Sequence, residues 1–260
     1  MRKLTPLAAA ALLLAACGGT DSKTNSVELR GDEYAFVMPE TIEGGWTTLE
    51  FTNTGSEWHE FALAKLGAGK TIADVRDYLA DPKSQQQPPP AWVQIRAGIP
   101  TLDGGEEAAL TQRLEPGRYV LLCFLDAPDG KTHIEHGMLR EFVIEGDAEA
   151  DIPEADAALQ LGSWQAAPEL EAGERTIELR NDGDEPSSVF LTSFRPGKTE
   201  KDLTAWEESG MRGPAPARFL GGVIDVPPHT SVYYTIDLEQ SQEYTLLDDE
   251  RGIQGSFTAK

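Results

Sequence analysis

The sequence repeats itself, and this repetition limits what the chain can fold into more than any other feature. The segment FTNTGSEWHEFAL (51–63) aligns without gaps on LRNDGDEPSSVFL (179–191), an offset of 128 positions. At the same offset GKTIADVRDYL (69–79) matches GKTEKDLTAWE (197–207), and EPGRYVLL (115–122) matches EQSQEYTLL (239–247) after small deletions. Because these matches occur in the same order, we predict two tandem copies of one fold.

Each copy is predicted to consist mainly of β-strands. TTLEFTN (47–53) alternates apolar and polar residues, which is the period of a half-buried strand. HEFALAKL (59–66) and RYVLLCFL (118–125) are apolar runs bounded by turn residues. One helix is expected in each copy, because Thr71 with Asp74, and Thr199 with Asp202, have the spacing of a capping box.

Several short strands joined by long connections are typical of a Greek-key β-sandwich. We therefore predict an all-β protein of two tandem Greek-key β-sandwich domains, each with one inserted helix. The first domain is placed at residues 27–146 and the second at 158–260. The acidic segment 147–157 carries few large apolar residues and is interpreted as the linker.

The N-terminus, MRKLTPLAAAALLLAAC, has a basic start and a short apolar stretch. It is too short for a membrane span, which needs roughly 20 apolar residues, so residues 1–16 are interpreted as a signal peptide. Residues 14–17, Leu-Ala-Ala-Cys, resemble the lipobox of bacterial lipoproteins, which implies lipidation of Cys17 and a lipid-anchored protein in the cell envelope, on the periplasmic or external face. A plain signal peptide with an incidental cysteine is the alternative. The polar residues 17–26 would form a tether.

The chain is strongly acidic, with 44 Asp and Glu against 22 Lys and Arg and a formal net charge of −22. Removal of residues 1–16 takes away Arg2 and Lys3, so the formal charge of the mature chain is −24. Such a surface repels nucleic acid and anionic lipid and attracts cationic partners. We expect a partner protein with a basic docking patch, no nucleic acid, and membrane contact through the lipid anchor alone.

If Cys17 carries lipid, Cys123 is the remaining thiol of the chain, in a compartment where cysteines usually pair. Such a thiol is either buried and inert or bonded to something other than sulfur. His59 begins a predicted strand, and two such strands in a sandwich can bring this imidazole and the Cys123 thiol together at one end. The loop after Cys123 then supplies His133 and Met138 at the same end.

This order of residues, a histidine after an asparagine-containing turn and then Cys, His and Met near the domain's end, resembles the ligand pattern of the cupredoxin family of type 1 copper proteins. The resemblance covers residues 27–145, and covers the second copy as a fold only. It implies a mononuclear copper site with His59, Cys123, His133 and Met138 as ligands, in a cupredoxin-like sandwich. Nine residues separate Cys123 from His133, more than in small cupredoxins, so His136 stays open as the substitute ligand.

The donor types agree with this implication, because a soft thiolate, two imidazoles and a weak thioether suit copper in both oxidation states. A carboxylate-ligated variant through Glu60 is disfavoured, since strand alternation points Glu60 away from His59. The second copy has Ser187 and Asp248 where the first has His59 and Cys123, so one copper per chain is expected.

An electron carrier in the cell envelope is the leading functional hypothesis. A copper-handling or delivery protein and a metal-free cupredoxin-like binding module are the alternatives. Enzymatic activity is not expected, because a multicopper enzyme needs many histidines and this chain has four, His59, His133, His136 and His229. The sequence also contains no phosphate-binding loop or nucleophile–base set.

Overall fold

The computed structural model describes residues 25–81, 83, 87–162, 169–248 and 252–260. The predicted signal peptide, Cys17 and most of the predicted tether lie outside the described residues. No helix in the described part of the chain is long and apolar enough to span a bilayer.

The prediction of an all-β fold with one helix in each copy is confirmed. The first half of the chain contains β1 (Asn25–Asp32), β2 (Ala35–Val37), β3 (Thr41–Asn53), β4 (His59–Leu66), α1 (Ile72–Ala80), β5 (Val93–Leu102), β6 (Glu107–Leu114), β7 (Gly117–Leu122) and β8 (Leu139–Ala148). The second half contains β9 (Ala157–Gln160), β10 (Gly173–Asn181), β11 (Ser187–Phe194), α2 (Glu200–Glu208), β12 (Ala217–Val226), β13 (Thr230–Leu238), β14 (Glu243–Asp248) and β15 (Gly252–Thr258). Strand β1 thus begins inside the segment interpreted as a tether, and β8 and β9 extend into the segment interpreted as a linker.

The two halves use equivalent residues for equivalent bonds. In both helices a threonine and the aspartate three positions later form the predicted capping box, Thr71 with Asp74 and Thr199 with Asp202. The equivalent threonine pairs Thr48–Thr111 and Thr176–Thr235 bridge neighbouring strands at 2.8 and 2.9 Å between their hydroxyl oxygens. Because these contacts recur at equivalent positions, we call the two halves the first and second repeat.

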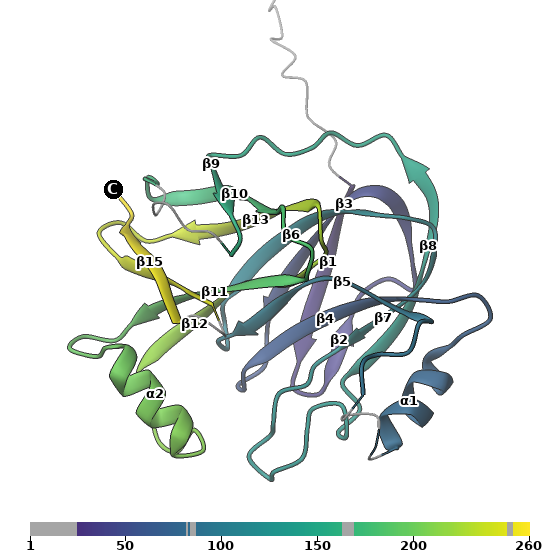
Figure 1. Ribbon diagram of the computed structural model, residues 1–260, viewed down its shortest axis with the longest axis horizontal. Coiled ribbons are helices and arrows are strands. Elements are labelled where there is room, and N and C mark those ends of the chain that lie inside the picture. Colours follow the sequence, from purple (N-terminus) through teal and green to yellow (C-terminus); the bar gives the residue numbers. More distant parts are fainter. Residues whose placement is uncertain (1–24, 82, 84–86, 163–168, 249–251) are drawn as a thin grey trace, which may run out of the picture.

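The strands form one continuous sheet that folds into two layers, which are joined where β8 pairs parallel with β3, and both layers continue from one repeat into the other (Figure 1). In one layer β5 pairs antiparallel with β12, for example Leu102 with Leu220. In the other layer β6 pairs antiparallel with β13, for example Leu110 with Tyr234. Because β5 is equivalent to β12 and β6 to β13, each strand pairs with its own counterpart, as in an isologous interface around a twofold axis.

The space between the layers holds one hydrophobic cluster that includes residues from both repeats. The largest fully buried side chains include Phe51, Phe61 and Tyr119 from the first repeat and Tyr234 and Tyr244 from the second. Helix α1 covers the outer face of β4 and β7 through a separate cluster around Val75. The repeats therefore share a core, and this core fixes the strand ends that carry the candidate site.

Candidate metal centre

The candidate site lies where β4 begins and β7 ends. These strands pair antiparallel, with Ala62 opposite Leu122, so the first residue of β4 and the residue after β7 come to the same end of the sheet. His59 is the first residue of β4, and Cys123 directly follows β7. The pairing of β4 with β7 thus brings the predicted ligands His59 and Cys123 to the same place.

The loop that follows Cys123 folds back over this end. Its backbone closes through Ala127 N–H to Lys131 O at 2.7 Å and His133 N–H to Leu125 O at 2.8 Å. Cys123 N–H donates to Met138 O at 3.3 Å, and Met138 N–H donates to His133 O at 2.8 Å. This bonding returns His133 to the thiol and places Met138 beside the strand end.

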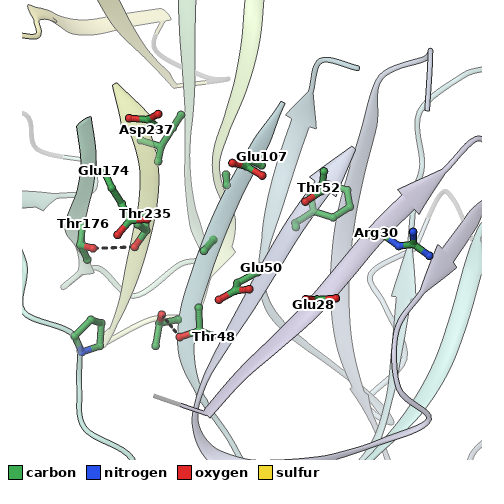
Figure 2. Close-up of a pocket in the computed structure, with 16 residues that line it drawn as sticks. Glu28, Arg30, Thr48, Glu50, Thr52, Glu107, Glu174, Thr176, Thr235 and Asp237 are labelled. Carbon is green, nitrogen blue, oxygen red and sulfur yellow. Dashed lines mark hydrogen bonds between the residues drawn. The ribbon is translucent and has the colours of Figure 1, made fainter. Parts of the chain in front are cut away.

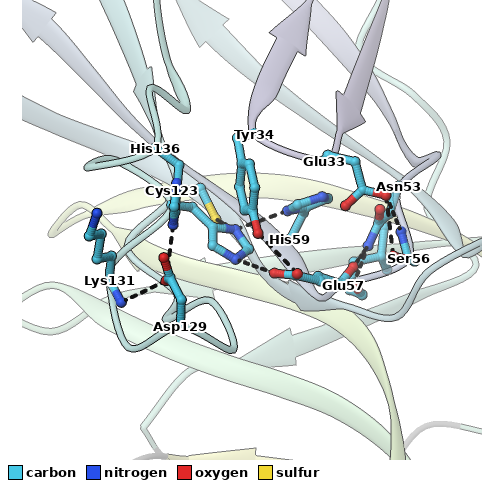
Figure 3. A network of polar contacts seen from close by, with 12 residues as sticks. Glu33, Tyr34, Asn53, Ser56, Glu57, His59, Cys123, Asp129, Lys131 and His136 are labelled. Carbon is cyan, nitrogen blue, oxygen red and sulfur yellow. Dashed lines mark hydrogen bonds and ion pairs between the residues drawn. The ribbon is translucent and has the colours of Figure 1, made fainter.

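Three ligand atoms converge there. The Nδ1 atoms of His59 and His133 lie 3.2 Å apart, and the Sγ atom of Cys123 lies 3.3 Å from His133 Nδ1 (Figure 3). Cys123 and His59 are fully buried and His133 is 1% exposed. Within the described ranges, no other three His, Cys, Asp or Glu side chains come close enough together to hold one ion.

Burial keeps this site neutral when no cation is present. Burial and the neighbouring His133 lower the pKa of His59 to about 4. Burial, then the charge of Glu60, raises the pKa of the Cys123 thiol to about 12. Burial also lowers the pKa of His133, against the opposite influence of Glu57. Two neutral imidazoles offer lone pairs, and a bound cation would compensate the charge of the thiolate, so the donor set fits a soft transition metal.

The two remaining candidate ligands, Met138 and His136, lie in different places relative to the converging atoms. The side chain of Met138 is fully buried at the strand end, in the main core cluster. His136 lies away from the three converging atoms, because its Nε2 atom is 3.0 Å from Asp129 Oδ1 and its ring stacks on Tyr34 at 4.3 Å between centroids. The structure thus brings His133, rather than His136, to His59 and Cys123.

Glu60 belongs to a separate contact. Its Oε1 atom accepts the Phe124 N–H at 2.9 Å, and burial raises the pKa of this carboxyl to about 7. Among the described residues, the group of converging ligand atoms consists of His59, Cys123 and His133 and does not include Glu60. This agrees with the strand alternation that points it away from His59.

Among the described residues of the second repeat, no such group occurs at the equivalent place. Phe190 lies opposite Leu247 as Ala62 lies opposite Leu122, so Asp248 is the counterpart of Cys123 and Ser187 that of His59. The pocket there, about 770 Å³, is lined mainly by polar and acidic side chains. His229 lies at a turn and pairs with Asp184 at 3.3 Å.

A second concave surface crosses both repeats on the outer face of one layer (Figure 2). This groove of about 570 Å³ is lined by threonines and by the carboxylates of Glu28, Glu50, Glu107, Glu174 and Asp237. It contains no imidazole or thiol, so it does not resemble the buried site chemically.

Two residues near the converging atoms were missed by sequence reasoning. Glu57 Oε2 lies 3.1 Å from His133 Nε2, and the Tyr34 hydroxyl donates to Glu57 Oε1 at 3.0 Å. The sequence did contain a signal for Glu57, because this residue recurs as Glu185 in the second copy and stands two positions before His59. The sequence contained no signal for Tyr34, since its contact with Glu57 joins residues 23 positions apart in the chain.

No family model matches the chain, and no curated protein matches it. Among solved structures, reduced auracyanin from Roseiflexus castenholzii is similar at 22% identity and a TM-score of 0.32, over 48% of this chain and 98% of that chain. Auracyanin B matches at 23% identity and 0.31, over 46% of this chain and 88% of that one. Auracyanin A, described as a blue copper protein from Chloroflexus aurantiacus, matches at 21% identity and 0.32, over 46% and 98%.

Proposed function

We propose that this protein carries single electrons through one type 1 copper ion held by His59, Cys123 and His133, with Met138 as a weak axial ligand. The convergence of two imidazole nitrogens and one thiol sulfur in a buried site supports this function most directly. A thiolate with two imidazoles accepts copper in both oxidation states. The role is that of a carrier, not an enzyme.

Copper, when bound, would supply a one-electron redox couple. Cys123 would bind as the thiolate and release its proton, and both histidines would bind through Nδ1. His59 is held by strand β4 and Cys123 by the end of β7, so these side chains have little freedom to rearrange when the charge of the ion changes. The exposed ring of Phe124 directly follows Cys123 and offers a contact surface next to the thiolate.

The cellular setting follows from the sequence. We propose a lipid anchor at Cys17, a position on the extracytoplasmic side, and a redox partner with a basic docking patch that complements the acidic surface. Replacing Cys17 with alanine should release the protein from membranes and abolish incorporation of labelled fatty acid. Unchanged membrane fractionation and labelling of the variant would contradict the anchor.

Copper loading followed by visible and EPR spectroscopy tests the copper site. The wild-type protein should show an intense thiolate-to-copper(II) band and bind one copper per chain by metal analysis. Cys123→Ser should abolish the band, since the sulfur donor is lost. Met138→Leu should keep the band and raise the reduction potential, because loss of the axial donor favours copper(I).

The same experiments separate the competing functions. A colourless copper-loaded protein would contradict the type 1 site, and absence of copper binding would favour a metal-free binding module. Copper binding without a reversible potential and rapid self-exchange would favour copper handling or delivery. Two tightly bound coppers per chain would contradict the expectation of one copper site, in the first repeat.

A further inference from the structure

His133 has close polar neighbours at both ring nitrogens. Nδ1 faces His59 Nδ1 and Cys123 Sγ at 3.2 and 3.3 Å, on the side of the proposed metal. Nε2, on the opposite side of the ring, lies 3.1 Å from Glu57 Oε2. The imidazole therefore lies between the converging donors and one carboxylate.

This contact fixes where the imidazole carries its proton. An ionised carboxylate only accepts hydrogen bonds, so a neutral His133 must hold its hydrogen on Nε2 to satisfy Glu57. The lone pair is then on Nδ1 and points at His59 and Cys123. A hydrogen-bonded carboxylate behind a ligand histidine also makes the ring a stronger donor.

The Glu57 carboxylate is itself held in place. Its second oxygen accepts the Tyr34 hydroxyl at 3.0 Å, and its backbone carbonyl accepts the Asn53 side-chain amide at 2.8 Å. The Tyr34 ring also meets the His133 ring edge-on, at 5.2 Å between centroids and 72° between planes. Tyr34, Glu57 and His133 are thus connected by polar contacts on the side of the His133 ring away from the converging donors. Figure 3 shows the Tyr34 and Glu57 side chains of this group.

We propose that Glu57 is a positioning residue that fixes the Nε2–H tautomer of His133 and, through its negative charge, favours copper(II) over copper(I). This role rests on the proposed copper site. Because the charge stabilises the more positive ion, Glu57 should lower the reduction potential.

The internal repeat supplies a matched control. Glu185 is the counterpart of Glu57, and its backbone carbonyl accepts the Asn181 side-chain amide at 2.8 Å, as the Glu57 carbonyl accepts Asn53. The residues at the Cys123 and His59 positions of the second repeat are Asp248 and Ser187, so the same charge stands there in the same turn without the donor set.

The experiment compares Glu57→Gln with Glu185→Gln by voltammetry of the copper-loaded full chain. Both variants lose one negative charge, and glutamine can still accept a hydrogen bond from His133 Nε2 at position 57. Glu57→Gln should keep the visible band and weaken the preference for copper(II) over copper(I) about tenfold, which raises the potential by about 59 mV. Glu185→Gln should leave the potential at the wild-type value.

Equal potentials in Glu57→Gln and wild type, with the band intact, would overturn the role of Glu57 and leave the copper site standing. Absence of the visible thiolate-to-copper(II) band from the copper-loaded wild-type protein would instead contradict the proposed function. The tautomer of His133 can also be measured in the copper-free wild-type protein. This test depends neither on copper binding nor on whether the Glu57→Gln variant folds. Long-range ¹H–¹⁵N spectra of the copper-free wild-type protein should show His133 as the Nε2–H tautomer, and an Nδ1–H tautomer would overturn the assignment.

Discussion

The imidazole of His59 is positioned by the absence of a side chain on Gly55. A Cβ atom built on Gly55 would lie 2.6 Å from His59 Nε2 and 3.2 Å from its Cδ2. His59 Nε2 has no hydrogen-bond partner among the described residues, so the ring is held there by close packing and by its Nδ1 contact. An alanine at position 55 would therefore overlap the ring, and the ring would have to shift.

Replacing Gly55 with alanine should displace the His59 ring and weaken or abolish the visible copper band. The overlap should also cost about 1–3 kcal/mol of folding stability, as overpacking in a tight core does. The control is Gly183→Ala, the same change in the second repeat, where the one described atom within 4 Å of the added methyl is Asn181 Oδ1, at 3.2 Å. Absorption spectra and thermal unfolding of the two variants give the comparison, and an unchanged spectrum in Gly55→Ala would contradict this role.

The turn between β3 and β4 is the element that holds the His59 end of the site. The buried side chain of Asn53 donates to Glu57 O and to Leu102 O, each at 2.8 Å, and its Oδ1 accepts the Gly55 N–H at 2.9 Å. One side chain thus fastens the turn to β5. Asn181 makes the same set of bonds in the second repeat, to Glu185 O and Val226 O, each at 2.8 Å, and from the Gly183 N–H at 3.0 Å.

Asn53→Ala should destabilise the protein by about 1–3 kcal/mol, because buried backbone groups lose their partners. Asn181→Ala should cost a similar amount, since the bonds are the same. The copper spectrum should distinguish them, changing in Asn53→Ala and staying at wild type in Asn181→Ala. Denaturant unfolding and absorption spectra of the two variants measure the difference, and identical spectra would argue against control of the site by this turn.

The sequence predicts these elements well where the determining contacts are local or repeated. Strand alternation, the capping boxes at Thr71 and Thr199, and the offset between the repeats all lie within short segments. The choice between His133 and His136 could not be made in this way, because it depends on how the loop after Cys123 closes, through bonds such as Ala127 N–H to Lys131 O. The pairing of the two repeats involves strands far apart in the sequence, and no local pattern specifies it.

At the scale of the whole molecule, each repeat covers two strand edges of the other. Strand β12 covers the edge of β5, and β13 covers the edge of β6, in both cases between equivalent strands. Unpaired edges expose backbone donors and acceptors that readily pair with another chain. A single repeat taken alone would expose both edges.

A fragment of residues 150–260 should therefore self-associate into a twofold dimer, with β12 pairing with β12 and β13 with β13 of the second molecule. Sedimentation equilibrium over a range of concentrations should show the dimer. The full chain, in which these edges are already paired, should show no such association through them. A fragment that folds and stays monomeric at every concentration would contradict this expectation.

The pairing of equivalent strands also bears on how a chain of two repeats could arise by gene fusion. An ancestral gene with one repeat would have needed two copies of its product to close the same two edges, and each copy would have carried its own site. Fusion of two such genes keeps both edge pairings within one chain and leaves selection free to relax at one site. In this chain, Ser187 and Asp248 stand at the positions of His59 and Cys123, while Asn181 and Gly183 keep the turn contacts of Asn53 and Gly55, so the second repeat has the turn of the site without its ligands.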